Sequence, residues 1–365
     1  MRESNIELLR IVSMVLIIMH HFSVHGTFPF TPDLTFNKVF LQVFGLGGKA
    51  GVVVFVMITG YFMVSSSFKL HKFTKLVGQI WFYSLVMIGV AMGLRLDTVT
   101  PKNTMLALLP IGAMSWFAQN FLVLYLLTPL INHVLHWLQH TYYVILLALF
   151  TVIWFLIPTA LNLWPDLPHT TFGFKHIFSF IVFYAMGAYI KLYESSSKLC
   201  SSYITQKTGI ILSAIGILGA FGGDILVDVL AMTDPTYIKQ IFYFTKNDYG
   251  FFQLLLGLGL FIVFLKAKIT YRPWINTVAS TTFGIYLLHD NKLFLHHMWD
   301  NVFGTYQYYE STLLPLYALL IVAIIFIVGM VVDYMRLAFI EKPVMKVLTP
   351  TLDRIQSRIE KNLKF

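Results

Sequence analysis

Ten apolar stretches, each about as long as a bilayer is thick, run along this sequence. A helix of about 20 apolar residues spans the hydrocarbon core of a membrane. Backbone groups in that core must bond within their own segment, which favours helices for stretches of this length. The sequence therefore predicts an all-α, polytopic membrane bundle with about ten transmembrane helices. The stretches lie at about 7–24, 43–64, 76–95, 115–135, 141–160, 175–193, 208–227, 249–266, 276–296 and 312–334.

The polar content of the chain agrees with this interpretation. Of the 365 residues, 57% are hydrophobic and only 12% are charged, whereas a soluble domain carries about 25% charged residues. So few charges cannot cover a water-soluble globule of this size. We expect one transmembrane bundle over residues 1–335, in a multi-pass protein of the cell membrane. A basic, amphipathic cytoplasmic tail is expected over 336–365, lying on the lipid of the inner leaflet.

The distribution of charge predicts the orientation of the bundle. Lys and Arg gather in cytoplasmic loops. If the N-terminus is inside, more than two thirds of the 26 Lys and Arg residues fall on the inner side, and the acidic residues lean outward. This predicts an N-in/C-in topology. A net charge of +9 would raise nucleic acid as a partner of a soluble protein, but topology explains it here, so no nucleic-acid partner is expected.

The first stretch carries ionisable residues, which are costly inside a membrane and therefore functional candidates. Arg10 and His21 are eleven residues apart, so they share one helical face about 16 Å apart along the axis. Glu7 lies within a turn of Arg10 and can pair with it. We interpret Arg10 as an anion-binding group, His21 as a general base and Glu7 as a further catalytic candidate. The alternative is a topology anchor at Arg10 and an interfacial histidine at His21.

A second group of polar residues lies near the end of the ninth stretch. Tyr286, His289 and Asp290 occupy neighbouring helical positions, and Asn291 follows them. A carboxylate beside an imidazole can fix its tautomer and raise its basicity. All four residues are candidates for substrate binding. The alternative is an ordinary polar helix end at the outer interface.

Lysines recur in the inner loop FKLHKFTKL, where Lys72 and Lys75 are candidates for binding a phosphate-rich cytoplasmic ligand or anionic lipid. The alternative is the positive-inside signal alone. Lys49, in GLGGKAGVVVF near an outer helix end, is explained by snorkelling.

No bound metal or cofactor is expected. His133, His136 and His140 follow helical spacing, but no acidic or thiol partner lies near them to complete a metal site. The single cysteine excludes an intramolecular disulfide.

Five motifs resemble one family. ELLRIVSMVLIIMHHF resembles the first helix of the acyltransferase-3 family of membrane O-acyltransferases, including its arginine and the histidine eleven residues later. Four further motifs agree in the order that the family shows, and together they cover nearly the whole chain. Their sequences are most similar to those of the family's Gram-positive branch. These motifs are VFVMITGYFM, WFAQNFLVLYLLTPLIN, FIVFYAMGAYI and TFGIYLLHDN.

The resemblance implies transfer of an acyl group, usually acetyl, from a cytoplasmic coenzyme A thioester to a hydroxyl of an extracytoplasmic or lipid-linked carbohydrate. Acyl-coenzyme A is then a co-substrate. His21 would be the essential histidine, and Arg10 would contact the donor or order the site. Trp116, which opens the fourth-helix motif, is a candidate for substrate binding. Phe121 stands where the family often has tyrosine, and lysines replace arginines in the basic loop.

Two other functions fit some of these features. A secondary transporter or flippase for a glycan or anionic solute would use Arg10, Glu7 and His21 as its substrate and proton path. It would show gradient-dependent flux without coenzyme A. A non-catalytic scaffold would tolerate replacement of Arg10 and His21. The enzyme would act alone or pass its acyl group to a separate extracytoplasmic partner.

Overall fold

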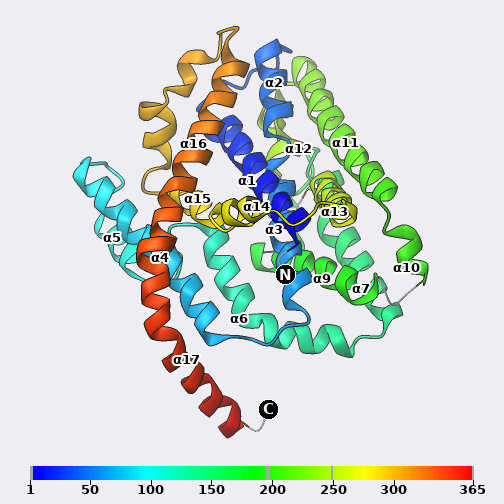
Figure 1. Cartoon of the computed structure of the whole chain (residues 1–365). Coiled ribbons are helices and arrows are strands. Elements are labelled where there is room, and N and C mark those ends of the chain that lie inside the picture. The colour runs from blue at the N-terminus through cyan, green and yellow to red at the C-terminus, as the bar shows by residue number, and fades with distance from the viewer. Residues whose placement is uncertain (1–2, 174, 195–197, 248–249, 364–365) are drawn as a thin grey trace.

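The computed structural model describes residues 3–173, 175–194, 198–247 and 250–363, and all regular elements in these ranges are helical (Figure 1). They contain nine segments long and apolar enough to cross a membrane, built on α1, α2–α3, α4, α6, α7–α8, α9, α11, α13 and α16. The predicted all-α, multi-pass fold is confirmed. The α-helices are α1 (Ser4–His25), α2 (Phe36–Gly45), α3 (Gly48–Met63), α4 (Leu70–Gly93), α5 (Pro101–Leu108), α6 (Trp116–Trp137), α7 (His140–Thr151), α8 (Ile157–Leu161), α9 (His176–Tyr193), α10 (Lys198–Tyr203), α11 (Gln206–Thr233), α12 (Tyr243–Lys246), α13 (Phe251–Lys266), α14 (Pro273–Ala279), α15 (Thr282–His289), α16 (Leu314–Arg336) and α17 (Lys342–Leu363).

The predicted span 276–296 is not one continuous helix, and this part of the prediction is corrected. The chain forms α14 and α15, which are separated at Ser280 and Thr281. The hydroxyls of these residues bond to the carbonyls of Thr277 and Val278, each at 2.7 Å. Ser and Thr side chains that bond locally to the backbone compete with helix formation, which accounts for the break.

The second span begins earlier than predicted and is also interrupted. Thr35 caps α2 by accepting a hydrogen bond from the Lys38 amide at 3.3 Å, and the helix breaks before α3 begins at Gly48. A Cβ atom at Gly48 would lie 2.0 Å from the Cβ of His20. Only glycine therefore allows α3 to pass so close to the last turns of α1.

Helices α1 and α13 run in opposite directions through the bundle. At one end of the bundle, Asn5 of α1 donates hydrogen bonds to the last carbonyls of α13, Phe264 and Leu265, at 3.0 and 3.2 Å. The Arg272 amide, just before α14, donates to the Ser4 hydroxyl at 2.9 Å. We call this the terminal end, because α1 begins there. The other end, where α1 finishes at His25, is the histidine end.

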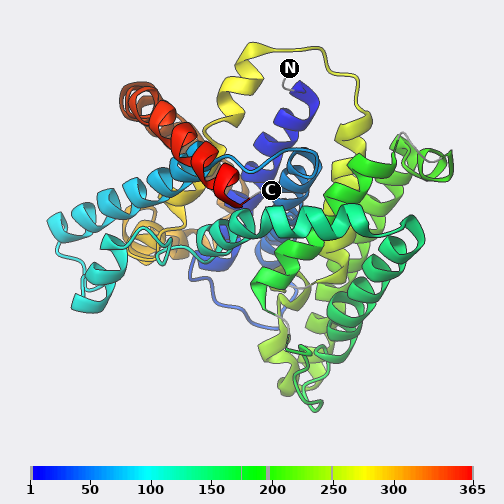
Figure 2. The same ribbon diagram turned by 90° about the horizontal axis from the view of Figure 1, so that it is seen from below.

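Helix α1 lies inside the bundle. Figure 1 shows it between α16 and α11, and from below (Figure 2) it lies between α4 on one side and α11 on the other. Its apolar residues Ile6, Leu9, Ile18 and Phe22 are fully buried. His20 and His21 on the same helix are buried as well, so these two side chains are surrounded by protein rather than lipid.

Helices α3 and α9 touch backbone to backbone. A Cβ atom at Gly60 would lie 2.0 Å from the carbonyl oxygen of Tyr184, and one at Gly187 would lie 2.0 Å from that of Met57. Small residues at helix crossings permit such close approach in membrane proteins. This contact fixes α9 against α3, and both helices begin at the histidine end.

Buried charges join α16 to its neighbours at the terminal end. The guanidinium of Arg336 donates from Nε to Asp333 at 2.6 Å and from Nη1 to Glu341 at 2.7 Å. Asp333 also accepts from the Tyr83 hydroxyl at 2.8 Å. After a π-helical turn over Leu337–Glu341, the chain continues as α17, which extends away from the bundle (Figures 1 and 2). The position of this tail on the inner leaflet stays a prediction.

Candidate active site

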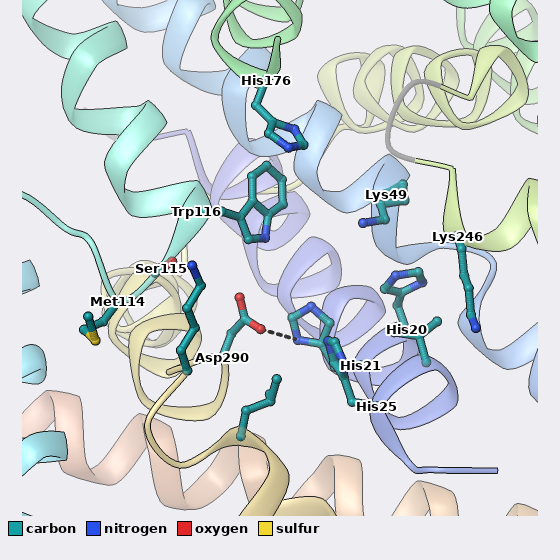
Figure 3. Close-up of a pocket in the computed structure, with 13 residues that line it drawn as sticks. His20, His21, His25, Lys49, Met114, Ser115, Trp116, His176, Lys246 and Asp290 are labelled. Carbon is teal, nitrogen blue, oxygen red and sulfur yellow. Dashed lines mark ion pairs between the residues drawn. The ribbon is translucent and has the colours of Figure 1, made fainter. Parts of the chain in front are cut away.

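A cavity of about 420 Å³ opens at the histidine end, where the last turns of α1 meet the first residues of α3, α6 and α9 (Figure 3). The loop that follows α15 closes another wall. Ionisable side chains dominate the lining, although the surrounding bundle is apolar. The lining residues are His20, His21, Val24, His25, Lys49, Met114, Ser115, Trp116, His176, Lys246, Asp290, Lys292 and Leu295.

His21 is held by a second histidine. Its Nδ1 lies 3.0 Å from Nε2 of His289, and Nδ1 of His289 lies 2.7 Å from the carbonyl oxygen of Ile285. A carbonyl only accepts, so Nδ1 of His289 donates, and its neutral ring then accepts at Nε2. His21 must therefore donate from Nδ1. Its Nε2 keeps a lone pair, which is the form that a general base requires.

A carboxylate lies beside this histidine pair. Oδ1 of Asp290 is 3.8 Å from Nδ1 of His21, and its Oδ2 accepts a hydrogen bond from the Tyr286 hydroxyl at 2.5 Å. The Ser115 hydroxyl donates to that of Tyr286 at 3.3 Å. A positive charge that develops on His21 during proton abstraction would be stabilised by this carboxylate.

Trp116 forms an aromatic wall of the cavity. It is the first residue of α6, which Ser115 caps by accepting from the Ala118 amide at 3.3 Å. The Trp116 ring centroid lies 4.8 Å from that of His176, and Nζ of Lys49 lies 5.7 Å from it. The Lys49 ammonium thus lies at the cavity wall. The sequence alone predicts only a snorkelling lysine at this position.

An acyltransferase-domain family model, that of acyltransferase-3, matches residues 3–334. The chain belongs to the acyltransferase-3 family. It is an integral membrane acyltransferase, and the matched region ends within the last turns of α16. No match was found among curated proteins or among solved structures.

Several residues of this acyltransferase site were not found by sequence reasoning. His25 lies one helical turn beyond His21, with ring centroids 5.0 Å apart, so helical spacing could have found it. Ser115, His176 and Lys246 come from helices that are distant in sequence, and no local pattern marks them. Asn291, which was a candidate, is buried and its Oδ1 accepts from the Leu293 amide at 3.0 Å, so it shapes the loop.

Arg10 and Glu7 lie elsewhere in the acyltransferase. Nε of Arg10 is 3.7 Å from Oε2 of Glu7, and the Glu7 side chain is buried. Fourteen residues of α-helix separate Glu7 from His21, a rise of about 21 Å. The structure therefore does not bring Glu7 to His21, and the Arg10–Glu7 pair belongs to the terminal half of α1.

Lys72 and Lys75 lie at the terminal end, on the first turns of α4. Lys75 lines a second cavity of about 600 Å³, and its ammonium pairs with Glu341 at 2.6 Å. Asn276 also lines this cavity; it is only 8% exposed, and its amide has no hydrogen-bond partner among the residues described. The remaining lining residues are Glu341 itself, Tyr271, Pro273, Thr277, Ser280, Tyr334, Leu337 and Lys342.

Three side chains in this cavity could also hold a metal ion. His21, His25 and Asp290 each offer one ligand atom, and within the described ranges these atoms lie within 4.8 Å of one another. Two imidazoles and a carboxylate form a ligand set that zinc accepts. The sequence predicted no metal site, because it does not reveal that Asp290 lies next to α1.

Proposed function

We propose that this enzyme transfers an acetyl group from cytoplasmic acetyl-coenzyme A to a hydroxyl of an extracytoplasmic or lipid-linked carbohydrate. The observation that carries the proposal is the lone pair on Nε2 of His21, fixed by the hydrogen bond to His289 in a substrate-sized cavity. Neutral imidazole is the usual base for a hydroxyl near pH 7. Aromatic faces such as that of Trp116 suit a sugar ring.

In the proposed reaction, Nε2 of His21 removes the proton of the acceptor hydroxyl as its oxygen attacks the thioester carbonyl. The new C–O bond forms, the C–S bond breaks, and the proton passes from His21 to the departing coenzyme A thiolate. Asp290 stabilises the imidazolium that exists between these steps. General acid–base catalysis of this kind contributes about 10²–10⁴-fold to a rate.

The terminal end is proposed to face the cytoplasm and to bind the donor. Supporting observations are the lysine-containing cavity, in which Lys75 and Lys342 could meet phosphates, and the buried Asn276 amide, which could bond to a nucleotide. Lys72 lies one turn before Lys75 on the same helix. Arg10, between the two ends on α1, would order the donor or its path toward His21.

The first test is acetyl-coenzyme A hydrolysis or transfer to mixed glycan acceptors by purified wild type and His21→Ala. We expect turnover by the wild type and a loss of at least about 10²-fold in the variant. His136→Ala is the matched control, because His136 is exposed on α6 and its Nδ1 bonds to the Asn132 carbonyl at 2.7 Å. Equal rates for His21→Ala and wild type would refute the catalytic role.

The same purified protein distinguishes the enzyme from the transporter alternative. If the folded wild type neither binds nor turns over acetyl-coenzyme A, and liposomes show gradient-dependent flux, the donor assignment fails.

Initial-rate kinetics then distinguish two routes within the enzyme. Direct transfer predicts sequential kinetics, whereas a covalent acyl-enzyme predicts ping-pong kinetics. Transfer that requires added extracytoplasmic protein would indicate a separate partner.

A further inference from the structure

Three lysines line the cavity that contains His21. Lys49 lies in the first turn of α3, Lys246 ends α12, and Lys292 follows α15. Among the lining residues that the structure describes, Asp290 is the one carboxylate. Positive side chains from three separate elements therefore converge on one small cavity and exceed its negative charge.

Two of these lysines lie against aromatic rings. Nζ of Lys246 lies 4.3 Å from the ring centroid of Phe30 and 5.5 Å from that of Phe242. Lys49 lies against Trp116. Aromatic faces attract a cation and hold its ammonium group in place, and Lys246 and Lys292 are exposed, so their charges are accessible to a ligand at the cavity. Such lysines indicate an anionic ligand.

The nearest buried carboxylate on α11 does not serve this cavity. Asp224 accepts hydrogen bonds from the Phe244 and Thr245 amides at 2.9 and 3.1 Å and from the Thr245 hydroxyl at 2.5 Å. It does not line the cavity. Asp224 therefore holds α12 in place and so positions Lys246.

The charges are separated within the cavity. Figure 3 shows Lys49 and Lys246 on the side of His20, and Asp290 on the opposite side of His21. A substrate whose anionic group meets the lysines would leave its hydroxyl near His21, between the two charged regions. The arrangement suits one molecule that carries both groups.

We propose that the acceptor is an anionic carbohydrate or polyol, bearing a phosphate or a carboxylate that Lys49 and Lys246 bind. This inference rests on the proposed function and specifies its acceptor class. Recognition of the charge gives the enzyme a preference over neutral sugars of the same shape. Phosphate and carboxylate share this chemistry, and the test separates them.

The test compares three acceptors that differ at one position: methyl glucoside, methyl glucuronide and methyl glucoside 6-phosphate. For the wild type we expect kcat/KM to be at least about tenfold higher for a charged acceptor than for the neutral one, equivalent to about 1.4 kcal/mol. The preferred anion identifies phosphate or carboxylate as the recognised group. Equal or better use of the neutral acceptor would overturn the inference while leaving the acyltransferase function intact.

Lysine variants locate the recognition. In Lys49→Gln and Lys246→Gln, the loss of kcat/KM should be larger for the charged acceptor than for methyl glucoside, and it should come mainly from KM. Lys49→Arg and Lys246→Arg should recover part of the preference. Lys102→Gln, an exposed lysine on α5, is the control and should match wild type. A rise in KM for acetyl-coenzyme A instead would assign these lysines to the donor and contradict the proposal.

Direct binding keeps the two proposals distinguishable. The three methyl glycosides are titrated calorimetrically into wild type and Lys246→Gln. Monodispersity and thermal stability are checked for each variant. Binding of the anionic compound that is weakened by Lys246→Gln supports the anion site even if no acetyl transfer occurs, in which case the proposed function alone fails. Binding of no anionic compound by a folded wild type overturns the inference.

Discussion

At the residue scale, the two nitrogens of the His21 ring are distinguished by their surroundings. Nδ1 faces His289 at 3.0 Å, and this bond assigns the proton to that nitrogen. In the proposed mechanism, His289 and Asp290 have different roles, because His289 sets the tautomer of His21 whereas Asp290 stabilises its charge. Their separate contributions can be measured with single substitutions.

We expect His289→Ala to lower kcat by roughly 10²-fold with little change in KM, because the His21 ring loses the acceptor that fixes its tautomer. Initial rates at saturating acetyl-coenzyme A measure this. His21→Ala/His289→Ala should be no slower than His21→Ala, since His289 acts through His21. Additive losses in the double variant would mean that His289 has an independent role.

We expect Zn²⁺, added in excess over the enzyme, to inhibit it. A zinc ion held by His21, His25 and Asp290 would occupy the lone pair that the base needs. Removal of the metal with EDTA should restore the rate. His25→Ala should raise the half-inhibitory zinc concentration by about tenfold or more, in line with the loss of a ligand. Inhibition unchanged by this substitution would place the zinc elsewhere.

Part of this site was predictable from the sequence. Helical spacing placed Tyr286, His289 and Asp290 together, and the cost of burying charge singled out His21. Spacing could not show that His21 and His289, 268 residues apart, are in contact. The assignment of Lys49 to snorkelling relied on one helix alone, because the Trp116 ring beside it comes from another.

At the element scale, long apolar periodic runs identified the membrane helices, whereas their interruptions were missed. Thr281 and its neighbours are compatible with a helix by composition, so the break between α14 and α15 was not visible. The end of the short helix α15 at His289 is important, because the backbone leaves the helical conformation at Asp290. The position of the Asp290 carboxylate beside His21 depends on that helix end.

We expect Gly187→Val to destabilise the enzyme by at least about 1–3 kcal/mol, the usual range for an overpacked site. The reason is that a Cβ there would lie 2.0 Å from the Met57 carbonyl oxygen, and backbone cannot yield as a flexible side chain does. Gly89→Val on α4 is the control, since nothing lies within 4 Å of its Cβ position. Thermal unfolding in detergent measures both, and equal melting temperatures would contradict the close α3–α9 contact.

At the scale of the whole molecule, the terminal end is held together by charges that the bundle buries. Arg336 is 4% exposed and lies between Asp333 and Glu341, and Glu341 also pairs with Lys75. These pairs connect α16, the π-helical turn before α17 and α4. These ion pairs could not be predicted from the sequence, because each partner alone resembles an ordinary charged residue at a helix end.

We expect Arg336→Met to cost about 3–5 kcal/mol, because it leaves two buried carboxylates without their shared cation. Arg336→Met/Asp333→Asn should recover part of that loss, since one of the two charges is removed. Thermal unfolding in detergent measures both variants. A single variant as stable as wild type would mean that water or lipid headgroups already neutralise these carboxylates.

The contact between α1 and α15 also dictates an order of assembly. Ribosomes add about 5–20 residues per second, so His289 follows His21, 268 positions earlier, after roughly a quarter of a minute to about one minute. During that interval the nascent α1 holds Glu7, Arg10 and His21 in or beside the lipid without its later partners. In the proposed mechanism, a polypeptide released before α15 therefore carries His21 without the partner that fixes its tautomer.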